Sequence, residues 1–437
     1  MSEQARMLLW GRTIGAVLLE DGEDVAVFQY DPEFALSGIQ VSPVSMPLRA
    51  APYSFPALSY ETFKGLPGLL SDSLPDKYGN ALIDSWLARQ GRRPESASAV
   101  ERLSYIGTRG MGALEFAPVK GPDPSEEEDI RIADLVELAS AILSERGEFQ
   151  TTLAEGNEES GLLEILSVGM SAGGARAKAM IAWNEATGQV RAGQVDAPPG
   201  FEHWLLKFDG VSVGSDRESL ESPEGYGAIE YAYAKMAMAA GVEMAPSRLF
   251  AENGRRHFMT RRFDRPTRNT KLHMQSLGGL CHFDFNLAGA YSYEQALLAI
   301  RDLGLPMTAI EQQFRRMAFN VVARNQDDHV KNIAFLMDRV GAWSLSPAYD
   351  VTYAFNPNRK WTREHQMSLN GKRDRFELDD FLAVAAVTSM KRGRAETILA
   401  EVIAAVSEWP AFASAEQVPD RDIERIGKTH RLTFPRH

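Results

Sequence analysis

The spacing of apolar residues changes once along this chain, and that change restricts the folds open to it. Short β-like runs dominate before about residue 265, as in TIGAVLL, AKAMIAW and HWLLKFDG. Beyond that point helical spacing prevails, as in TAIEQQFRRMAFNVVARNQ, where apolar residues recur every three or four positions. A β-rich half followed by a helical half predicts a two-lobed α+β protein.

Composition shifts divide the chain further. PVKGPDPSEEED, residues 118 to 129, is rich in proline and acidic residues, which is typical of a linker. The sequence therefore predicts three parts. They are a β-containing N-terminal subdomain (1–118), a β-rich lobe (119–265) and a mostly helical lobe (266–437).

The overall composition favours a protein of the cytoplasm. The chain has 437 residues, enough for two or three domains, and 44% of them are hydrophobic. A single cysteine, Cys281, excludes an intramolecular disulfide framework and favours a reducing compartment. No apolar stretch approaches the length of a membrane helix, so we expect no membrane association. The net charge of −12 argues against broad binding to nucleic acid.

The segment ARNQDDHVKN, residues 323 to 332, concentrates reactive side chains directly after a helical pattern. Asp327 and Asn332 have the five-residue spacing of a kinase catalytic loop, in which the aspartate accepts the substrate proton and the asparagine holds magnesium. Asp350, in WSLSPAYDVTYAF, follows a β-like run and could bind the same metal ion. The alternative is that these side chains only cap helices. Asp328 is a second candidate for the base.

Two upstream features suit a nucleotide. SVGMSAGGARAK, residues 167 to 178, is a loop of small residues before a β run, and it predicts a glycine-rich flap over phosphates. A Walker loop is not favoured, because it would need Lys followed by Ser or Thr, and then a helix. Lys207 lies in an apolar β run, where an ammonium group requires an anion such as phosphate. The alternatives are a flexible turn and an edge-strand lysine that faces water.

The order of these features favours phosphoryl transfer from ATP with Mg²⁺. A glycine-rich loop, a strand lysine, Asp-x-x-x-x-Asn and a further aspartate follow one another as in kinases. Two other interpretations stay open. One is a small-molecule kinase of the aminoglycoside-phosphotransferase type. The other is a module without catalysis, either a degenerate pseudokinase that binds nucleotide or a nucleotide-independent binding module. The eight histidines form no metal-binding pattern, and we expect core or surface roles for them.

SAGGARAK, LLKFDG, RRFDR, DDHVKN and PAYDV together resemble the HipA family of serine/threonine protein kinases, the toxins of bacterial type II toxin–antitoxin systems. The resemblance covers most of the chain. It implies a kinase-like fold with an additional β-containing N-terminal subdomain. It also implies a small helix-turn-helix antitoxin as partner, contact with DNA only through that antitoxin, and a protein substrate such as an aminoacyl-tRNA synthetase.

The resemblance also assigns roles to residues. It implies that Asp327 is the catalytic base, that Asn332 and Asp350 bind magnesium, and that Lys207 binds phosphates. Autophosphorylation that switches the kinase off is implied at Ser171, with Ser167 as a second candidate. The remaining nucleotide contacts are Ala172, Gly173, Gly174, Ala175, Arg176 and Lys178 in the flap, Arg261, Arg262 and Phe263 at the adenine hinge, and His329, Lys331 and Tyr349 near the nucleotide.

This sequence departs from the usual family pattern at two places. Arg261 stands where a glutamate usually begins the hinge motif, and Arg176 and Ala177 stand where glutamine and glutamate are usual in the flap. The residues expected to transfer the phosphoryl group match the pattern.

Overall fold

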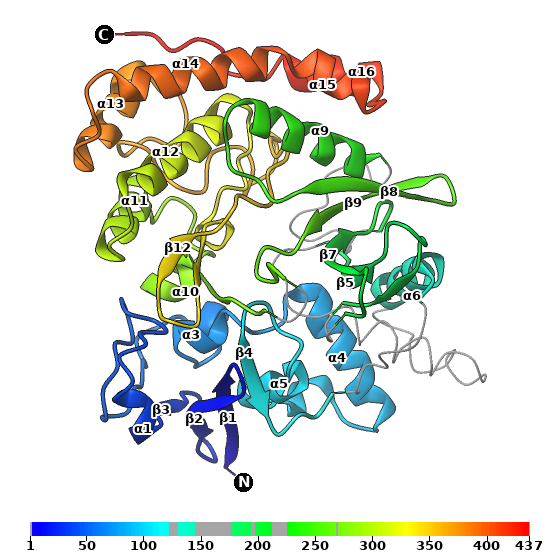
Figure 1. The fold of residues 1–437 in the computed structure, drawn as a ribbon, viewed down its shortest axis with the longest axis vertical. Helices are drawn as coiled ribbons and strands as arrows, with labels where there is room; N and C mark the ends of the chain where they lie inside the picture. Colours follow the sequence, from blue (N-terminus) through cyan, green and yellow to red (C-terminus); the bar gives the residue numbers. More distant parts are fainter. Residues whose placement is uncertain are drawn as a thin grey trace. The chain divides into compact units, whose positions relative to one another are not determined.

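The computed structural model describes residues 2–121, 130–144, 176–193, 197–211, 225–267 and 270–436. These residues form two compact units (Figure 1). The first comprises Met1–Glu224, Phe250–Gln275 and Leu336–Ala342, and the second comprises Gly225–Leu249, Ser276–Phe335 and Trp343–His437. The chain passes between the units inside three strands, which are β8 (Ser247–Glu252), β10 (His273–Ser276) and β11 (Ala334–Met337).

The N-terminal part of the first unit is built on an antiparallel sheet with the order β3-β2-β1-β4. Its strands are β1 (Glu3–Leu9), β2 (Arg12–Leu19), β3 (Val27–Tyr30) and β4 (Leu114–Ala117). In β1, Ala5, Met7 and Leu9 are buried and alternate with more exposed residues, as expected for a strand with one face on a core.

Helices follow β3 and lead to β4. They are α1 (Pro32–Ala35), α2 (Tyr60–Phe63), α3 (Gly68–Ser71), α4 (Lys77–Arg89), the 3₁₀ turn η1 (Pro94–Ser96) and α5 (Ala99–Ile106). The Asp76 side chain accepts a hydrogen bond from the Gly79 N–H and so caps α4. Helix α5 packs on β1, where it buries Val100 and Leu103.

The second sheet of this unit has the order β6-β5-β7-β9-β8. Its other strands are β5 (Lys178–Trp183), β6 (Val190–Ala192), β7 (Glu202–Lys207) and β9 (Arg255–Arg261), and helix α6 (Ile132–Ser144) precedes them in the chain. Five consecutive residues of β5, from Lys178 to Ala182, are buried. This burial on both faces explains why AKAMIAW is a continuous apolar run apart from its lysine.

The second unit is mostly helical. Its elements are α9 (Tyr226–Ala239), α10 (Leu277–Cys281), α11 (Tyr293–Asp302), α12 (Met307–Val322), η2 (Val330–Asn332), β12 (Trp343–Leu345), α13 (Leu378–Val387), α14 (Arg394–Ser407), α15 (Trp409–Ala415) and α16 (Asp420–Gly427). Helix α12 packs against α11 and α14, while α9 packs against α14 and α15 (Figure 1). The apolar stripe predicted for α12 is buried, as Phe314, Met317 and Val321 show.

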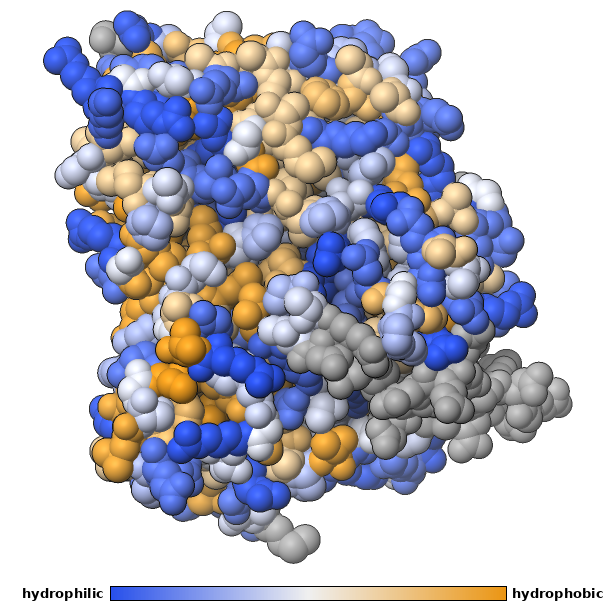
Figure 2. Space-filling view, in the orientation of Figure 1, coloured by the Kyte–Doolittle hydropathy of each residue, from blue (hydrophilic) through white to orange (hydrophobic). Residues whose placement is uncertain are grey.

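The exposed surface mixes residue types. Figure 2 shows hydrophilic and hydrophobic residues interspersed over the face that it draws. Among the helices described, no single one is long and apolar enough to span a membrane. The helix pair α14 and α15, bent by 47°, passes that test of length and composition only when the two are taken together.

The predicted change from β-rich to helical sequence is confirmed, because the larger sheets belong to the first unit and most long helices to the second. The strands expected at AKAMIAW and HWLLKFDG are β5 and β7, and the helix expected at TAIEQQFRRMAFNVV is α12. The division into residues 1–118, 119–265 and 266–437 stays a prediction.

Buried histidines make the stability of this fold depend on pH. Burial lowers the pKa of His203, His257, His273, His282 and His430 to about 4. In the unfolded chain a histidine has a pKa of about 6.5. Between these two values the unfolded state binds protons that the folded state does not, so stability falls as the pH falls through this window.

We therefore expect the free energy of unfolding to decrease between pH 7.5 and pH 5, on the order of 1 kcal/mol for each of these histidines. Urea unfolding at a series of pH values measures this free energy. Most carboxylates titrate below this range, with ordinary pKa values near 4, so the range isolates the histidines. A free energy of unfolding that stays constant from pH 7.5 to pH 5 would contradict the assignment.

Candidate active site

The loop that follows α12 is held by main-chain hydrogen bonds to a segment further along the chain. Arg324, at a φ of 60°, turns the chain out of the helix. The Ala354 N–H donates to the Arg324 carbonyl at 3.1 Å, and the Gln326 N–H donates to the Ala354 carbonyl at 3.2 Å. The loop 323–332 and the segment that begins at Asp350 are thereby fixed against each other.

Asp328 is the buried anchor of this loop. Its carboxylate accepts hydrogen bonds from the Tyr293 hydroxyl at 2.5 Å, from His365 Nδ1 at 2.7 Å and from the Gln366 N–H at 2.7 Å. Burial alone would raise the pKa of Asp328, but the hydrogen bonds and the neighbouring His365 hold it below the ordinary value. The side chain is 1% exposed. Asp328 therefore connects three segments of the unit and has no surface to offer a substrate.

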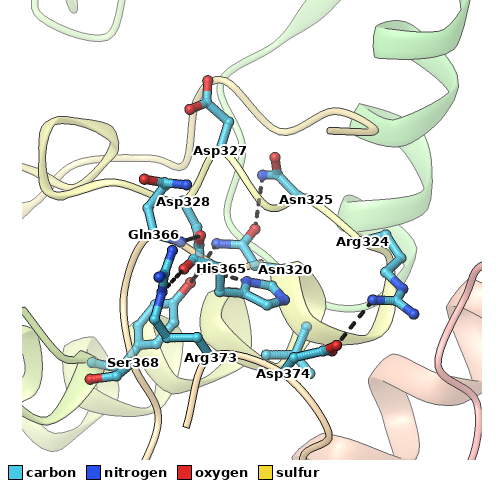
Figure 3. A network of polar contacts seen from close by, with 12 residues as sticks. Asn320, Arg324, Asn325, Asp327, Asp328, His365, Gln366, Ser368, Arg373 and Asp374 are labelled. Carbon is cyan, nitrogen blue, oxygen red and sulfur yellow. Dashed lines mark hydrogen bonds and ion pairs between the residues drawn. The ribbon is translucent and has the colours of Figure 1, made fainter. Parts of the chain in front are cut away.

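Asp327 has the opposite orientation. Figure 3 shows its carboxylate pointing away from the cluster of polar side chains around Asp328 and His365. The side chain is 39% exposed, and Asp327 Oδ1 lies 3.8 Å from His329 Nε2. Of the two adjacent aspartates, Asp327 is therefore the one that a substrate hydroxyl can reach.

Side-chain hydrogen bonds hold Asn332 to the main chain of Asp327, and Asp350 to the loop at Asn325. Asn332 Nδ2 donates to the Asp327 carbonyl at 2.7 Å, which leaves its Oδ1 as the acceptor atom. Asn325 Nδ2 donates to the Asp350 carbonyl at 3.4 Å. The Tyr349 hydroxyl donates at 2.5 Å to the carbonyl of the residue that precedes Asn332.

These atoms suit a hard cation. Magnesium prefers oxygen ligands and takes few of them from protein when it is carried by phosphates. Asn332 Oδ1 and the Asp350 carboxylate supply two such oxygens on fixed loops. No group of three or more His, Cys, Asp or Glu side chains that could hold a metal ion occurs in the described ranges. The two oxygens fit magnesium bound together with a nucleotide.

The other residues predicted near the nucleotide in this unit belong to the same loops. Lys331 Nζ lies 5.1 Å from the centre of the Phe285 ring, and that ring lies 6.0 Å from the His329 ring. His329, Lys331 and Tyr349 are each partly exposed. The structure thus brings them together with Asp327 on one surface of the second unit.

In the first unit, the two predicted lysines lie opposite each other on neighbouring strands. Lys178 begins β5 and Lys207 ends β7, and the two are direct partners in the antiparallel register. Direct partners project from the same face of a sheet. Lys178 Nζ forms a buried ion pair with Asp76 at 2.6 Å, while Lys207 Nζ lies 5.8 Å from the centre of the Phe258 ring.

The arginines predicted at the adenine hinge contact nearby carboxylates of the first unit. Arg261 lies 3.3 Å from Glu202, and Arg262 is buried with its guanidinium bound to Asp264 at 2.7 and 3.0 Å. The Arg262 side chain therefore stabilises the fold, and its main-chain N–H donates to the His203 carbonyl. Phe263 and Arg176 are half-buried. Outside the described residues lie Ser167, Ser171, Ala172, Gly173, Gly174 and Ala175.

Some residues of the site had no individual signal in the sequence. His365 and Tyr293 bind Asp328 from 37 and 35 positions away. Arg431 donates from Nη1 to His365 Nε2 at 3.0 Å and also pairs with Asp374. No local spacing rule connects such distant positions.

Comparison with known proteins identifies two matching family models and a related fold. The sequence model of the HipA N-terminal domain matches residues 5–117, and that of the HipA-like C-terminal domain matches residues 170–409. No curated protein matches the sequence. The predicted α+β, kinase-like fold class is confirmed.

Two solved structures are similar. One is HipA in a complex with HipB and operator DNA from Shewanella oneidensis MR-1, with a TM-score of 0.67 and 15% identity, covering 97% of this chain and 94% of that one. The other is the proinflammatory kinase CtkA of Helicobacter pylori, with a TM-score of 0.31 and 13% identity, covering 49% of this chain and 91% of that one.

The geometry predicts unequal effects on stability at the two adjacent aspartates. Asp328→Asn places an amide among three donors, so at least one of them loses its acceptor, at a cost of about 1–3 kcal/mol for each buried group left unpaired. Asp327→Asn, at an exposed position, should change stability by less than about 0.5 kcal/mol. Chemical denaturation of both variants measures the difference. Equal losses in the two would show that Asp328 is not the anchor.

Proposed function

This chain belongs to the HipA family, and from that membership and the geometry of its loops we propose that it is an ATP- and magnesium-dependent serine/threonine protein kinase. The observation that carries the proposal is the hydrogen bond from Asn332 Nδ2 to the Asp327 carbonyl. This bond links Asn332 to Asp327, the partly exposed aspartate of the pair, and so supports the proposal that the two residues act together in phosphoryl transfer.

In this proposal Asp327 accepts the proton of the serine or threonine hydroxyl. The hydroxyl oxygen bonds to the γ-phosphorus as the bond to the bridging oxygen breaks, and ADP leaves. Asn332 Oδ1 and the Asp350 carboxylate would hold magnesium, which when bound would neutralise charge on the phosphate oxygens. Lys207 and the flap residues Ala172 to Lys178 remain the proposed phosphate contacts.

The partners follow from the same family membership. The solved HipA that resembles this chain is bound to HipB and operator DNA. We accordingly propose a small helix-turn-helix antitoxin as partner here, with DNA contacted only through it, and no membrane association. A translation factor such as an aminoacyl-tRNA synthetase is the proposed substrate, and the cytoplasm is the proposed location.

The first functional prediction concerns the catalytic base. Incubation with ATP and magnesium alone should place a phosphate on Ser171 of the wild-type protein, as mass spectrometry would detect. Asp327→Asn should slow this reaction by about 10²–10⁴-fold, the usual effect of losing a general base. Thermal unfolding of the variant should match that of the wild type, because Asp327 is exposed.

Each outcome separates the proposal from its alternatives. Phosphate on a small-molecule acceptor, with none on the protein, would favour an aminoglycoside-phosphotransferase-like enzyme. Failure to bind Mg-ATP would favour a nucleotide-independent binding module, whereas binding of Mg-ATP without any phosphoryl transfer would favour a degenerate pseudokinase. An Asp327→Asn variant with wild-type activity would remove Asp327 from the role of base.

A second prediction concerns the metal. Asp350→Ala should weaken the binding of Mg-ATP more than the binding of ATP alone, because only the former uses the carboxylate of Asp350. Isothermal titration calorimetry with and without magnesium measures both affinities. Equal losses under the two conditions would exclude Asp350 as a metal ligand. Asp338→Ala is a suitable control, since Asp338 binds only N–H groups of its own turn among the contacts described.

A further inference from the structure

The last residues of the chain lie against the start of the catalytic loop. The Arg324 Nε donates to the Thr429 carbonyl at 2.7 Å, and the Arg431 N–H donates to the Val322 carbonyl at 2.9 Å. Between these two contacts, Tyr233 donates its hydroxyl to the Ala323 carbonyl at 2.8 Å. The C-terminal segment 429–431 therefore follows the backbone at the point where α12 ends and the loop begins.

The side chain of Arg431 extends from this segment toward the anchor of the loop. Its Nη1 donates to His365 Nε2 at 3.0 Å and to the Val321 carbonyl at 3.1 Å, while its Nη2 pairs with Asp374. His365 in turn contacts Asp328. A continuous set of contacts thus joins the C-terminal segment to the residue next to Asp327.

The two contacts of His365 determine which ring nitrogen carries its proton. Arg431 can only donate, so His365 Nε2 must be the acceptor and carry no proton. The Asp328 carboxylate accepts, so His365 Nδ1 must carry the proton. Burial, followed by the positive charges of Arg431 and Arg324, lowers the pKa of His365, although Asp328 acts in the opposite direction. His365 is therefore neutral, with its proton on the side of Asp328.

We propose that Arg431 is a positioning residue for phosphoryl transfer, which acts on Asp327 through His365 and Asp328. The inference rests on the proposed function. Without the guanidinium, His365 Nε2 loses its donor, and the ring is free to move its proton to Nε2 or to accept a second one. Asp328 loses its Nδ1 donor in the first case and faces a charged ring in the second, so in both cases the direction of the neighbouring Asp327 is no longer fixed. Among the contacts described for Arg431, its side chain meets His365, Asp374 and the Val321 carbonyl, and none of these contacts is with Asp327.

The experiment compares variants of Arg431 in the full chain. Arg431→Met keeps the length of the side chain but removes every donor, and kcat should fall by about 10–100-fold, the usual effect of a misplaced catalytic group. The KM for ATP should stay at the wild-type value. Arg431→Lys restores one donor and should recover part of the loss. Arg436→Ala changes an exposed arginine five residues further along the chain. It is the matched control and should retain wild-type kcat.

The pH profile distinguishes positioning from simple stabilisation. Loss of the Arg431 charge should raise the pKa of His365, so the fall in kcat on the acidic side should move to higher pH in Arg431→Met. A role limited to stability would reduce kcat by the same factor at every pH. The charged groups around His365 are Asp328 from the loop, Arg324 at the end of α12, Arg431 from the C-terminal segment, and Arg373 and Asp374 from its own segment.

Nitrogen-15 NMR of histidine-labelled protein provides a readout besides activity. The His365 ring, assigned with His365→Gln, should show a protonated Nδ1 and an unprotonated Nε2 in the wild type, and a changed pattern in Arg431→Met. A protonated Nε2 in the wild type would overturn the inference, even if Arg431→Met fails to fold. Unchanged kcat in Arg431→Met would overturn it while the proposed function stands, whereas a wild-type protein without phosphoryl transfer would overturn both.

Discussion

The carboxylate of Asp328 is the group on which the arrangement of the candidate site depends. A buried charge is costly unless its oxygens are saturated with hydrogen bonds, and here three donors from α11 and from the segment at residues 365–366 meet it. All three donors must reach the same carboxylate, so the elements that carry them are held in fixed positions relative to one another. Asp327 can be exposed on a rigid backbone because the residue next to it is held so firmly.

This arrangement separates two tasks between adjacent residues of the same type. Asp328 stabilises the loop and is almost completely buried, while Asp327 is partly exposed and is the proposed catalytic base (Figure 3). Asn332 combines both tasks in the proposed site, because its amide nitrogen fixes the loop and its oxygen is a proposed ligand of magnesium. A rigid set of groups of this kind needs little reorganisation during reaction, which is how protein electrostatics contribute most to catalysis.

The sequence predicted the parts of the protein that local patterns encode. Helix α12 followed from its apolar stripe, and strands β5 and β7 from their β-like runs. Asp327 and Asn332 were singled out by their five-residue spacing, and a hydrogen bond joins them in the structure. The sequence could not distinguish the environments of Asp327 and Asp328, because burial depends on His365 and Tyr293, which are distant in the chain. The ion pairs of Lys178 with Asp76 and of Arg262 with Asp264 were missed for a related reason: composition does not show which charged side chains are buried together.

A crystal structure with magnesium and a non-hydrolysable ATP analogue tests the central claim most directly, since the claim is that three loop residues form one phosphoryl-transfer site. The account predicts a magnesium ion bound by Asn332 Oδ1 and the Asp350 carboxylate, with the terminal phosphate facing Asp327. It also predicts that Asp328 keeps its three hydrogen bonds. A nucleotide bound away from these residues, or a metal ion coordinated by Asp328, would contradict it.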